Sequence, residues 1–331
     1  MRDIIIIGTS KAGFLHLNSY RKMENIGNIY FVDILGKSNN TNINVDKVWT
    51  SVSEIVFSKR LNTNQVIADL CIPKEEFGKV IKECLELGIY KIIVEKPLFV
   101  ESKLFQDYPN LDLLMVQNYL YSKITRDLVN ILRNQAYKIK FIYCNFSKNR
   151  IKDSCKGRGI SKKATMNFEI EMPHEIYLLL QILGDSSTIE ILSEVQQDFV
   201  FENKIWKDHG YGRIVCKSRE ILCVLESDLC TNISRREVLI ICNDGISLRV
   251  EYLQYDSNLN ITKKGRLVVE KNNKVIYVVN YENDDNMYEC LLEYYQYLNA
   301  EVHVNTYKNR ILDFSAFYKK LHVGCLECYI K

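Results

Sequence analysis

The sequence IIIIGTSKAG at residues 4–13 decides how the first part of this chain folds. Four consecutive isoleucines are typical of a strand buried on both faces of a parallel sheet. A turn with glycines at both ends follows, then a helical pattern, and a second apolar run at 29–32 ends at Asp33. Strand, tight turn, helix, strand and acid is the order of a dinucleotide-binding βαβ unit.

The turn after the isoleucines suits a pyrophosphate. Gly8 allows the chain to turn sharply off the strand, and Gly13 lets the helix pack close to the sheet. The start of the helix then presents unpaired N–H groups and a partial positive charge. Ser10 replaces the middle glycine of the usual G-x-G-x-x-G motif; its Cβ crowds the pyrophosphate, while its hydroxyl adds a donor. Asp33 is placed to accept hydrogen bonds from the two hydroxyls of the adenosine ribose.

We therefore expect this unit to bind a nicotinamide dinucleotide, with NAD slightly favoured over NADP by Asp33. Lys37 and Ser38 would suit a 2′-phosphate, which keeps NADP open; a solvated turn is the equal alternative for these two residues. The predicted cofactor-binding residues are Gly8, Thr9, Ser10, Lys11, Ala12, Gly13, Asp33, Ile72, Pro73, Glu95 and Asn118.

The alternation of strands and helices continues to about residue 120. Apolar runs predict strands at 65–72, 90–94 and 112–117, and helical spacing predicts a helix at 74–87 closed by Gly88. This pattern predicts an α/β fold whose N-terminal part, residues 1–120, is a Rossmann domain with a doubly wound parallel sheet.

The remainder of the chain, residues 121–331, has a different pattern. A strand is predicted at 139–146, and helices are predicted at 121–134, 287–298 and 313–329. Further strand-like segments occur at 214–216, 220–226, 237–241, 246–252, 266–270 and 275–281. Successive strands with few helices between them predict an α+β domain with a large, mainly antiparallel sheet.

Composition bounds the function. With 331 residues, 47% hydrophobic and 26% charged, the chain has the balance of an ordinary globular protein, and its net charge of +3 favours neither nucleic acid nor membrane as a partner. The sequence enters its first strand without a signal peptide, and its eleven cysteines are mostly single within apolar runs, so we expect a cytoplasmic protein with reduced thiols. The C-x-x-C at Cys325 and Cys328, near His322, is interpreted as core packing, and no metal is predicted.

Three features, in order, make the chain resemble the glucose–fructose oxidoreductase, inositol dehydrogenase and rhizopine catabolism (Gfo/Idh/MocA) family. The first is the Gly8–Gly13 turn with His16 three residues later. The second is the sequence EKP at 95–97 after a strand. The third is His174, followed ten residues later by Gly184. The order and spacing match the family over essentially the whole chain.

The resemblance implies an NAD(P)-dependent dehydrogenase or reductase that acts on a sugar, aminosugar or cyclitol-like alcohol or ketone, in a biosynthetic role. It makes Lys96 and His174 the catalytic residues beside the nicotinamide, with Glu95 near the nicotinamide ribose. Hydride transfer needs a proton donor or acceptor, which imidazole suits, and a cation for the developing alkoxide. The resemblance also implies a homodimer or homotetramer formed through the C-terminal sheet.

One position departs from the family pattern. The family commonly carries an aspartate four residues before the histidine, and Ile170 stands there. Glu171 is the candidate replacement for that acid. The missing acid leaves two alternatives open: reduction of an imine or another double bond, and a non-catalytic regulator of the same fold that senses the dinucleotide.

A basic stretch at 148–158 precedes the His174 helix and is expected to pass near the substrate. Arg150 and Arg158 would bind a carboxylate or phosphate, although a solvated loop is the slightly favoured alternative for either one. The predicted substrate-binding residues are Lys96, Arg150, Glu171 and His174.

Overall fold

The isoleucine run at residues 4–7 lies in the middle of a parallel sheet in the computed structural model of this chain. Strand β1, Asp3–Ile7, has β2 on one side and β4 on the other, both parallel to it. The side chains of Ile4, Ile5 and Ile6 are fully buried. A run of β-branched residues suits this position because helices and neighbouring strands cover it on all sides.

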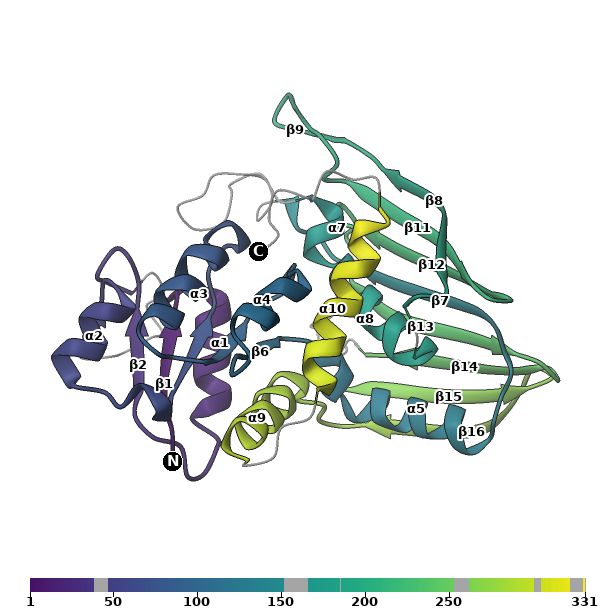
Figure 1. The fold of residues 1–331 in the computed structure, drawn as a ribbon. Helices are drawn as coiled ribbons and strands as arrows, with labels where there is room; N and C mark the ends of the chain where they lie inside the picture. The colour runs from purple at the N-terminus through teal and green to yellow at the C-terminus, as the bar shows by residue number, and fades with distance from the viewer. Residues whose placement is uncertain are drawn as a thin grey trace. The chain divides into compact units, whose positions relative to one another are not determined.

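The structure describes residues 1–38, 47–151, 166–184, 186–252, 262–300, 305–321 and 330. They form two compact units, both drawn in Figure 1. The first unit comprises the described residues within Met1–Asn118, Met287–Ser315 and Gly324–Lys331, and the second those within Tyr119–Asn286 and Ala316–Val323.

In the described part of the first unit, six parallel strands form a sheet in the order β3-β2-β1-β4-β5-β6. The other strands are β2 Ile29–Val32, β3 Val48–Trp49, β4 Val66–Leu70, β5 Lys91–Val94 and β6 Asp112–Met115. The strand order reverses at β1, and ligands of open α/β sheets bind beyond the carboxyl ends of the strands at such a point. The predicted doubly wound parallel sheet is confirmed.

Helices connect and flank these strands. They are α1 Lys11–Tyr20, α2 Val52–Lys59, α3 Phe77–Glu86, α4 Ser102–Asp107 and α9 Asn286–Asn299, with 3₁₀ turns η1 Thr63–Gln65 and η2 Lys74–Glu76. The helix predicted at 74–87 is therefore split into η2 and α3. Gly88 follows α3 with φ +78°, the left-handed conformation of a C-cap glycine.

The described residues within Met287–Ser315 fold with the first unit, although the sequence pattern places the domain boundary at residue 120. Helix α9 explains this placement. The Tyr294 hydroxyl donates to the Met115 carbonyl oxygen at 2.6 Å, and the Tyr295 hydroxyl accepts the Arg2 N–H at 3.0 Å. Tertiary contacts between residues so far apart in the sequence leave no local pattern, which is why the division missed them.

The described part of the second unit contains an eight-stranded sheet with the order β16-β15-β14-β13-β7-β12-β11-β8. Strands β7 and β12 are parallel, and the other neighbouring pairs are antiparallel. The strands are β7 Ile139–Ser147, β8 Ile189–Gln196, β11 Tyr211–Ser218, β12 Ile221–Asp228, β13 Arg235–Cys242, β14 Ile246–Glu251, β15 Gly265–Lys271 and β16 Lys274–Tyr281. A separate hairpin joins β9 Phe199–Phe201 to β10 Lys204–Trp206. The predicted large, mainly antiparallel sheet is confirmed.

The second unit also contains the helix that carries His174. The helical segments here are η3 Asn118–Tyr121, whose first residue belongs to the first unit, α5 Lys123–Asn134, α7 Asn167–Ile170 and α8 Met172–Leu183. Helix α10 Thr306–Lys319 continues into this unit from the first. Helix α8 packs against β7 and β12. It begins with Pro173 in its first turn and ends at Gly184, φ +76°, which are common start and stop signals.

Helix α10 begins at Thr306, seven residues before the start predicted from the sequence, so that prediction was wrong. Its first turns are mostly polar, and only Ile311 and Phe314 mark the buried face there. The predicted end at 329 lies outside the described residues, as do Cys325, Cys328 and His322. None of the helices described here is long and apolar enough to cross a membrane.

Candidate functional site

The turn between β1 and α1 has no room for a side chain at either glycine. Gly8 has φ +102°, and a Cβ there would lie 2.5 Å from the Cys71 carbonyl oxygen. A Cβ at Gly13 would lie 2.1 Å from the Gly8 carbonyl oxygen. The second glycine thus brings α1 against the turn, and the first lets the chain pass the end of β4 at the point where the strand order reverses.

The start of α1 is open and positively charged. Ser10 is the N-cap residue, its side chain is exposed, and within the described segments it makes no capping hydrogen bond. The first turn has no acidic residue, and exposed Lys11 is its first residue. A lysine at a helix N-terminus opposes the helix dipole, so this combination favours a bound anion such as a pyrophosphate.

Asp33 lies directly after β2 and is fixed by the turn after β1. Its Oδ2 accepts the Thr9 N–H at 3.2 Å and the Thr9 hydroxyl at 2.7 Å, and its Oδ1 accepts the Leu35 N–H at 3.1 Å. Thr9 is fully buried, so its side chain orients Asp33 from within the protein. Lys37 is exposed and Ser38 is half-buried, and both follow Asp33 in the described chain.

The other predicted cofactor residues of the first unit follow neighbouring strands. Ile72 and Pro73 are half-buried after β4, Glu95 and Lys96 are half-buried after β5, and Asn118 begins η3 beyond β6. The carboxyl ends of parallel strands meet at one edge of a sheet, so the structure brings this group together with Gly8–Gly13 and Asp33. The residues present fit a dinucleotide.

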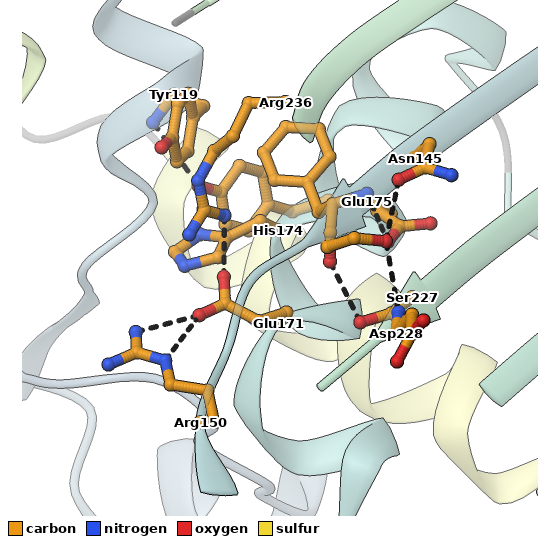
Figure 2. Close-up of polar contacts among 12 residues, drawn as sticks. Tyr119, Asn145, Arg150, Glu171, His174, Glu175, Ser227, Asp228 and Arg236 are labelled. Atoms are coloured by element: carbon orange, nitrogen blue, oxygen red, sulfur yellow. Dashed lines mark hydrogen bonds and ion pairs between the residues drawn. The ribbon is translucent and has the colours of Figure 1, made fainter. Parts of the chain in front are cut away.

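His174, the third residue of α8, lies among aromatic rings in the second unit (Figure 2). Its Nδ1 is 2.8 Å from the Tyr177 hydroxyl, which also accepts the Tyr119 N–H at 3.2 Å. The Tyr119 ring meets the imidazole edge-on at 5.0 Å, and the Phe146 ring stacks on it at 6.0 Å. His174 as a whole residue is 9% exposed. One ring nitrogen is thus oriented by a neutral hydroxyl.

Glu171 is the centre of a buried ion-pair cluster beside His174 (Figure 2). Its Oε1 accepts from Arg150 Nε at 2.9 Å and from Arg150 Nη2 at 2.7 Å. Its Oε2 pairs with Arg236 Nη1 at 2.5 Å. The Arg236 guanidinium also lies over the rings of Phe146 and Tyr119, at 5.2 and 5.7 Å. One carboxylate therefore faces two cations.

The charge of Arg236 is preserved although the side chain is buried. Burial opposes the cation, but the Glu171 carboxylate outweighs it and raises the pKa of Arg236 above its ordinary value. Arg236 was missed by the sequence reasoning. It is the second residue of β13, far along the chain from Glu171, and a strand pattern does not reveal which carboxylate a residue will meet.

Glu175, next to His174, anchors α8 to the sheet. Its two oxygens accept the backbone N–H groups of Phe146, at 3.1 Å, and Glu226, at 2.8 Å. Burial raises the pKa of Glu175 well above its usual value; the two hydrogen bonds oppose this, and the Glu171 charge adds to it. This carboxyl, which the sequence reasoning also missed, fixes the start of α8 and so the backbone of His174.

The predicted site residues fall into two groups. Lys96 belongs to the first unit, with the dinucleotide residues. Arg150, Glu171 and His174 belong to the second unit, where Arg150 and Glu171 bind each other directly. Arg158 lies outside the described residues.

Solved structures share this two-unit fold. KijD10, a 3-ketoreductase from Actinomadura kijaniata in complex with NADP and TDP-benzene, superposes with a TM-score of 0.78 at 12% identity, over 98% of this chain and 97% of that one. A dehydrogenase (MviM) from Clostridium difficile gives a TM-score of 0.66 at 16% identity, over 96% of this chain and 98% of that one. No family model matches the sequence, and no curated protein matches it. At these identities the likeness establishes the fold.

Proposed function

We propose that this protein is an NAD(P)-dependent oxidoreductase that transfers a hydride to or from a sugar, aminosugar or cyclitol-like alcohol or ketone, in a biosynthetic role. The observation that carries the proposal is the β1–α1 turn, where Gly8 and Gly13 exclude side chains and the helix start is open and cationic. The shared fold of KijD10, which was solved with NADP, supports the same conclusion. So does the resemblance of the sequence to the Gfo/Idh/MocA family.

The residues of the first unit would hold the dinucleotide. The N–H groups of α1 and the Lys11 ammonium bind the pyrophosphate, and Asp33 binds the adenosine ribose. We propose a preference for NAD over NADP, because the Asp33 carboxylate repels a 2′-phosphate. When bound, the nicotinamide supplies or accepts the hydride.

Lys96 and His174 would perform the remaining chemistry. The Lys96 ammonium stabilises the oxyanion that develops on the substrate, and the His174 imidazole delivers or removes the proton. Tyr177 and Glu175 orient this imidazole through its Nδ1 and its backbone. Arg150 and Arg236, which both pair with Glu171, supply two guanidinium groups, and guanidinium groups suit a substrate with a phosphate or carboxylate group.

Glu171 favours one alternative. Because its carboxylate is neutralised by two arginines, it does not offer the free acid that the family has at the position of Ile170. Reduction of an imine or another double bond therefore stays open beside the ketone reaction. We also propose that the protein acts in the cytoplasm as a homodimer or homotetramer, formed through the second-unit sheet, where β16 exposes Val275, Ile276 and Tyr277.

Cofactor binding is the first test. The chain has two tryptophans, Trp49 next to Asp33 and Trp206 in the second unit, so a Trp206→Phe variant reports on the first unit alone. Titration with NADH and with NADPH should give energy transfer from Trp49 to the nicotinamide, with tighter binding of NADH. Asp33→Asn should weaken NADH more than NADPH. If neither nucleotide binds, the proposal is wrong.

Turnover is the second test. Keto-sugars, their phosphorylated forms and their imines are screened by loss of the nicotinamide absorbance band. Lys96→Ala and His174→Gln should each lower kcat/KM by about a hundredfold or more, because each removes a group that acts in the transition state. Lys91→Ala is the matched control, since Lys91 lies at the opposite end of β5 and pairs with Asp112. If cofactor binds and no variant changes turnover, the assignment of the two residues is wrong.

A further inference from the structure

A row of buried charged side chains runs through the first unit and ends at Glu95, the residue before Lys96. His16 lies on α1 with its side chain fully buried. Its Nδ1 is 2.8 Å from Asp69 Oδ2, on β4, and its Nε2 is 3.0 Å from Glu95 Oε1, after β5. The sequence marked His16 only as part of a family pattern, and the proposed reaction gives it no role.

The geometry requires a charged imidazole. A neutral imidazole carries one N–H, and its other nitrogen would direct a lone pair at a carboxylate oxygen. Both ring nitrogens of His16 face a side-chain carboxyl group, so with both of these groups ionised both nitrogens donate. Burial opposes the charge, but the Asp69 carboxylate outweighs it and raises the pKa of His16 well above its ordinary value.

At one end of this row of charged side chains, the Asp69 carboxylate is surrounded by hydrogen-bond donors. Tyr20 donates its hydroxyl to Asp69 Oδ2 at 2.8 Å, and the Cys71 thiol lies 3.8 Å from Asp69 Oδ1. Burial raises the pKa of Cys71 to about 12, so the thiol stays protonated. His16, Asp69 and Cys71 are also close enough to share a metal ion, which would have to displace the thiol proton and an imidazole proton.

At the other end of the row, Glu95 is next to Lys96, the proposed catalytic lysine. Burial alone would raise the pKa of Glu95, but the hydrogen bond and charge of His16, together with the charge of Lys96, lower it below its usual value. The second oxygen of Glu95 accepts the Lys96 N–H at 3.2 Å. The carboxylate is thus bound on one side by the imidazolium and on the other by the backbone of Lys96.

We propose that His16, as an imidazolium, is a positioning residue that anchors the Glu95 carboxylate and, through it, sets the place and the electrostatic surroundings of Lys96. This inference rests on the proposed function where it takes Lys96 to be catalytic. Without the imidazolium, Glu95 is free to turn and pair with the Lys96 ammonium, and the lysine is drawn away from the substrate.

The charge of His16 is measured directly by NMR. The chain has five histidines, so ¹⁵N-histidine labelling gives few signals, and those that disappear in His16→Gln belong to His16. Both ring nitrogens should stay protonated between about pH 6 and pH 8, above the ordinary histidine range. The other groups that face the ring are Asp69, Cys71, Glu95, Tyr20 on its own helix and, from α9, Cys290. A ring with one unprotonated nitrogen at about pH 7.5 would overturn the inference.

Two matched variants separate positioning from stability. In His16→Gln the side-chain amide reaches the place of Nε2 and can still donate to Glu95, while in His16→Asn it reaches only the place of Nδ1 and keeps Asp69. Both variants lose the charge. Tyr20→Phe is the control, because it removes a hydrogen bond from the far side of Asp69 and leaves Glu95 untouched.

The position of Lys96 is followed by its rate of acylation with an amine reagent, located by mass spectrometry. A lysine paired with Glu95 is a weaker nucleophile, so His16→Asn should slow labelling by about threefold, the equivalent of about half a pKa unit. His16→Gln should slow it less, and Tyr20→Phe should leave it unchanged. With a reducible substrate, His16→Asn should lower kcat by about tenfold at unchanged KM for the cofactor.

The outcomes separate this inference from the proposed function. Equal labelling of Lys96 in wild type, His16→Asn and His16→Gln would show that His16 is structural only, whatever the protein catalyses. If the wild type binds neither NADH nor NADPH, the proposed function fails, but the NMR spectrum and the labelling rates still decide the role of His16. If His16→Asn does not fold, the NMR of the wild type and the His16→Gln labelling decide it.

Discussion

The two units each bury a cluster of charged side chains, and the two clusters have opposite arrangements. In the first unit one cation, His16, lies between the carboxylates of Asp69 and Glu95. In the second unit one anion, Glu171, lies between the guanidinium groups of Arg150 and Arg236. The first cluster has one excess negative charge, which the neighbouring Lys96 balances. The second presents two guanidinium groups, which are the side chains best suited to an anionic ligand.

Each cluster has a histidine in it or beside it, and the two histidines differ in the groups that lie next to their ring nitrogens. His16 donates from both ring nitrogens to carboxylates, so it is held in one charge state. His174 has the neutral phenol hydroxyl of Tyr177 at 2.8 Å from Nδ1 and aromatic rings around it. A group that exchanges protons must be able to exist in both states. The comparison therefore gives the first histidine a fixed electrostatic role and leaves the second suited to proton transfer.

The largest effect is expected when the anion of the second cluster is removed. Glu171→Gln removes the carboxylate charge that pairs with the buried Arg236 and with Arg150. An uncompensated buried charge costs about 3–5 kcal/mol, so the free energy of unfolding should fall by that amount in a urea titration. Glu86→Gln is the control, because it breaks the exposed pair with Lys82 and should cost about 0.5 kcal/mol or less. If the two variants lose similar amounts of unfolding free energy, the charges of the Glu171 cluster are screened by solvent as much as an exposed ion pair is.

A smaller effect is expected when the cation of the first cluster loses its proton. The pKa of His16 is raised in the folded protein, so its stabilisation is complete below the unfolded value of about 6.5 and is lost as the pH rises toward the folded value. One proton corresponds to about 1.4 kcal/mol per pH unit, or about 2 kcal/mol between pH 6.5 and pH 8.

The measurement is the difference in unfolding free energy between wild type and His16→Gln across this range of pH. Glu175 also lowers stability as the pH rises, because its pKa is raised in the folded protein. Both proteins contain Glu175, so its contribution cancels in the difference. A difference that does not change with pH would mean that His16 binds the same number of protons folded and unfolded.

The sequence predicted the first cluster's surroundings better than the cluster itself. The apolar runs, Gly8, Gly13 and the acid after the second strand are local signals, and they predicted the parallel sheet and its turn correctly. The carboxylates that His16 meets lie 53 and 79 residues further along the chain. Periodicity shows which face of an element is buried, but it does not show which polar groups meet there.

The second cluster shows the same limit more strongly. Glu171 and Arg150 were predicted as separate contacts to substrate, and the structure shows them bound to each other. Arg236, their third member, had no signal in the sequence, because an arginine at the start of a strand is usually solvated. Helix α9 was assigned to the second domain on chain order, whereas its tyrosines bind groups of the first unit. Each of these features depends on a tertiary contact between segments distant in the sequence.

The smallest effect concerns His174, the histidine that we propose exchanges protons. Tyr177→Phe removes the hydroxyl that lies 2.8 Å from His174 Nδ1 and that accepts the Tyr119 N–H. The loss of bonds between neutral groups should cost about 1 kcal/mol in the free energy of unfolding. If Tyr177 orients the imidazole, kcat should fall by about fivefold while the affinity for the dinucleotide, measured by Trp49 energy transfer, stays unchanged.

A carboxylate partner would favour the imidazolium, so Tyr177→Asp should move the pH dependence of kcat to higher pH. A profile that keeps its position in Tyr177→Asp would mean that His174 is not the proton-exchanging group, and the contrast between the two histidines would then concern packing alone.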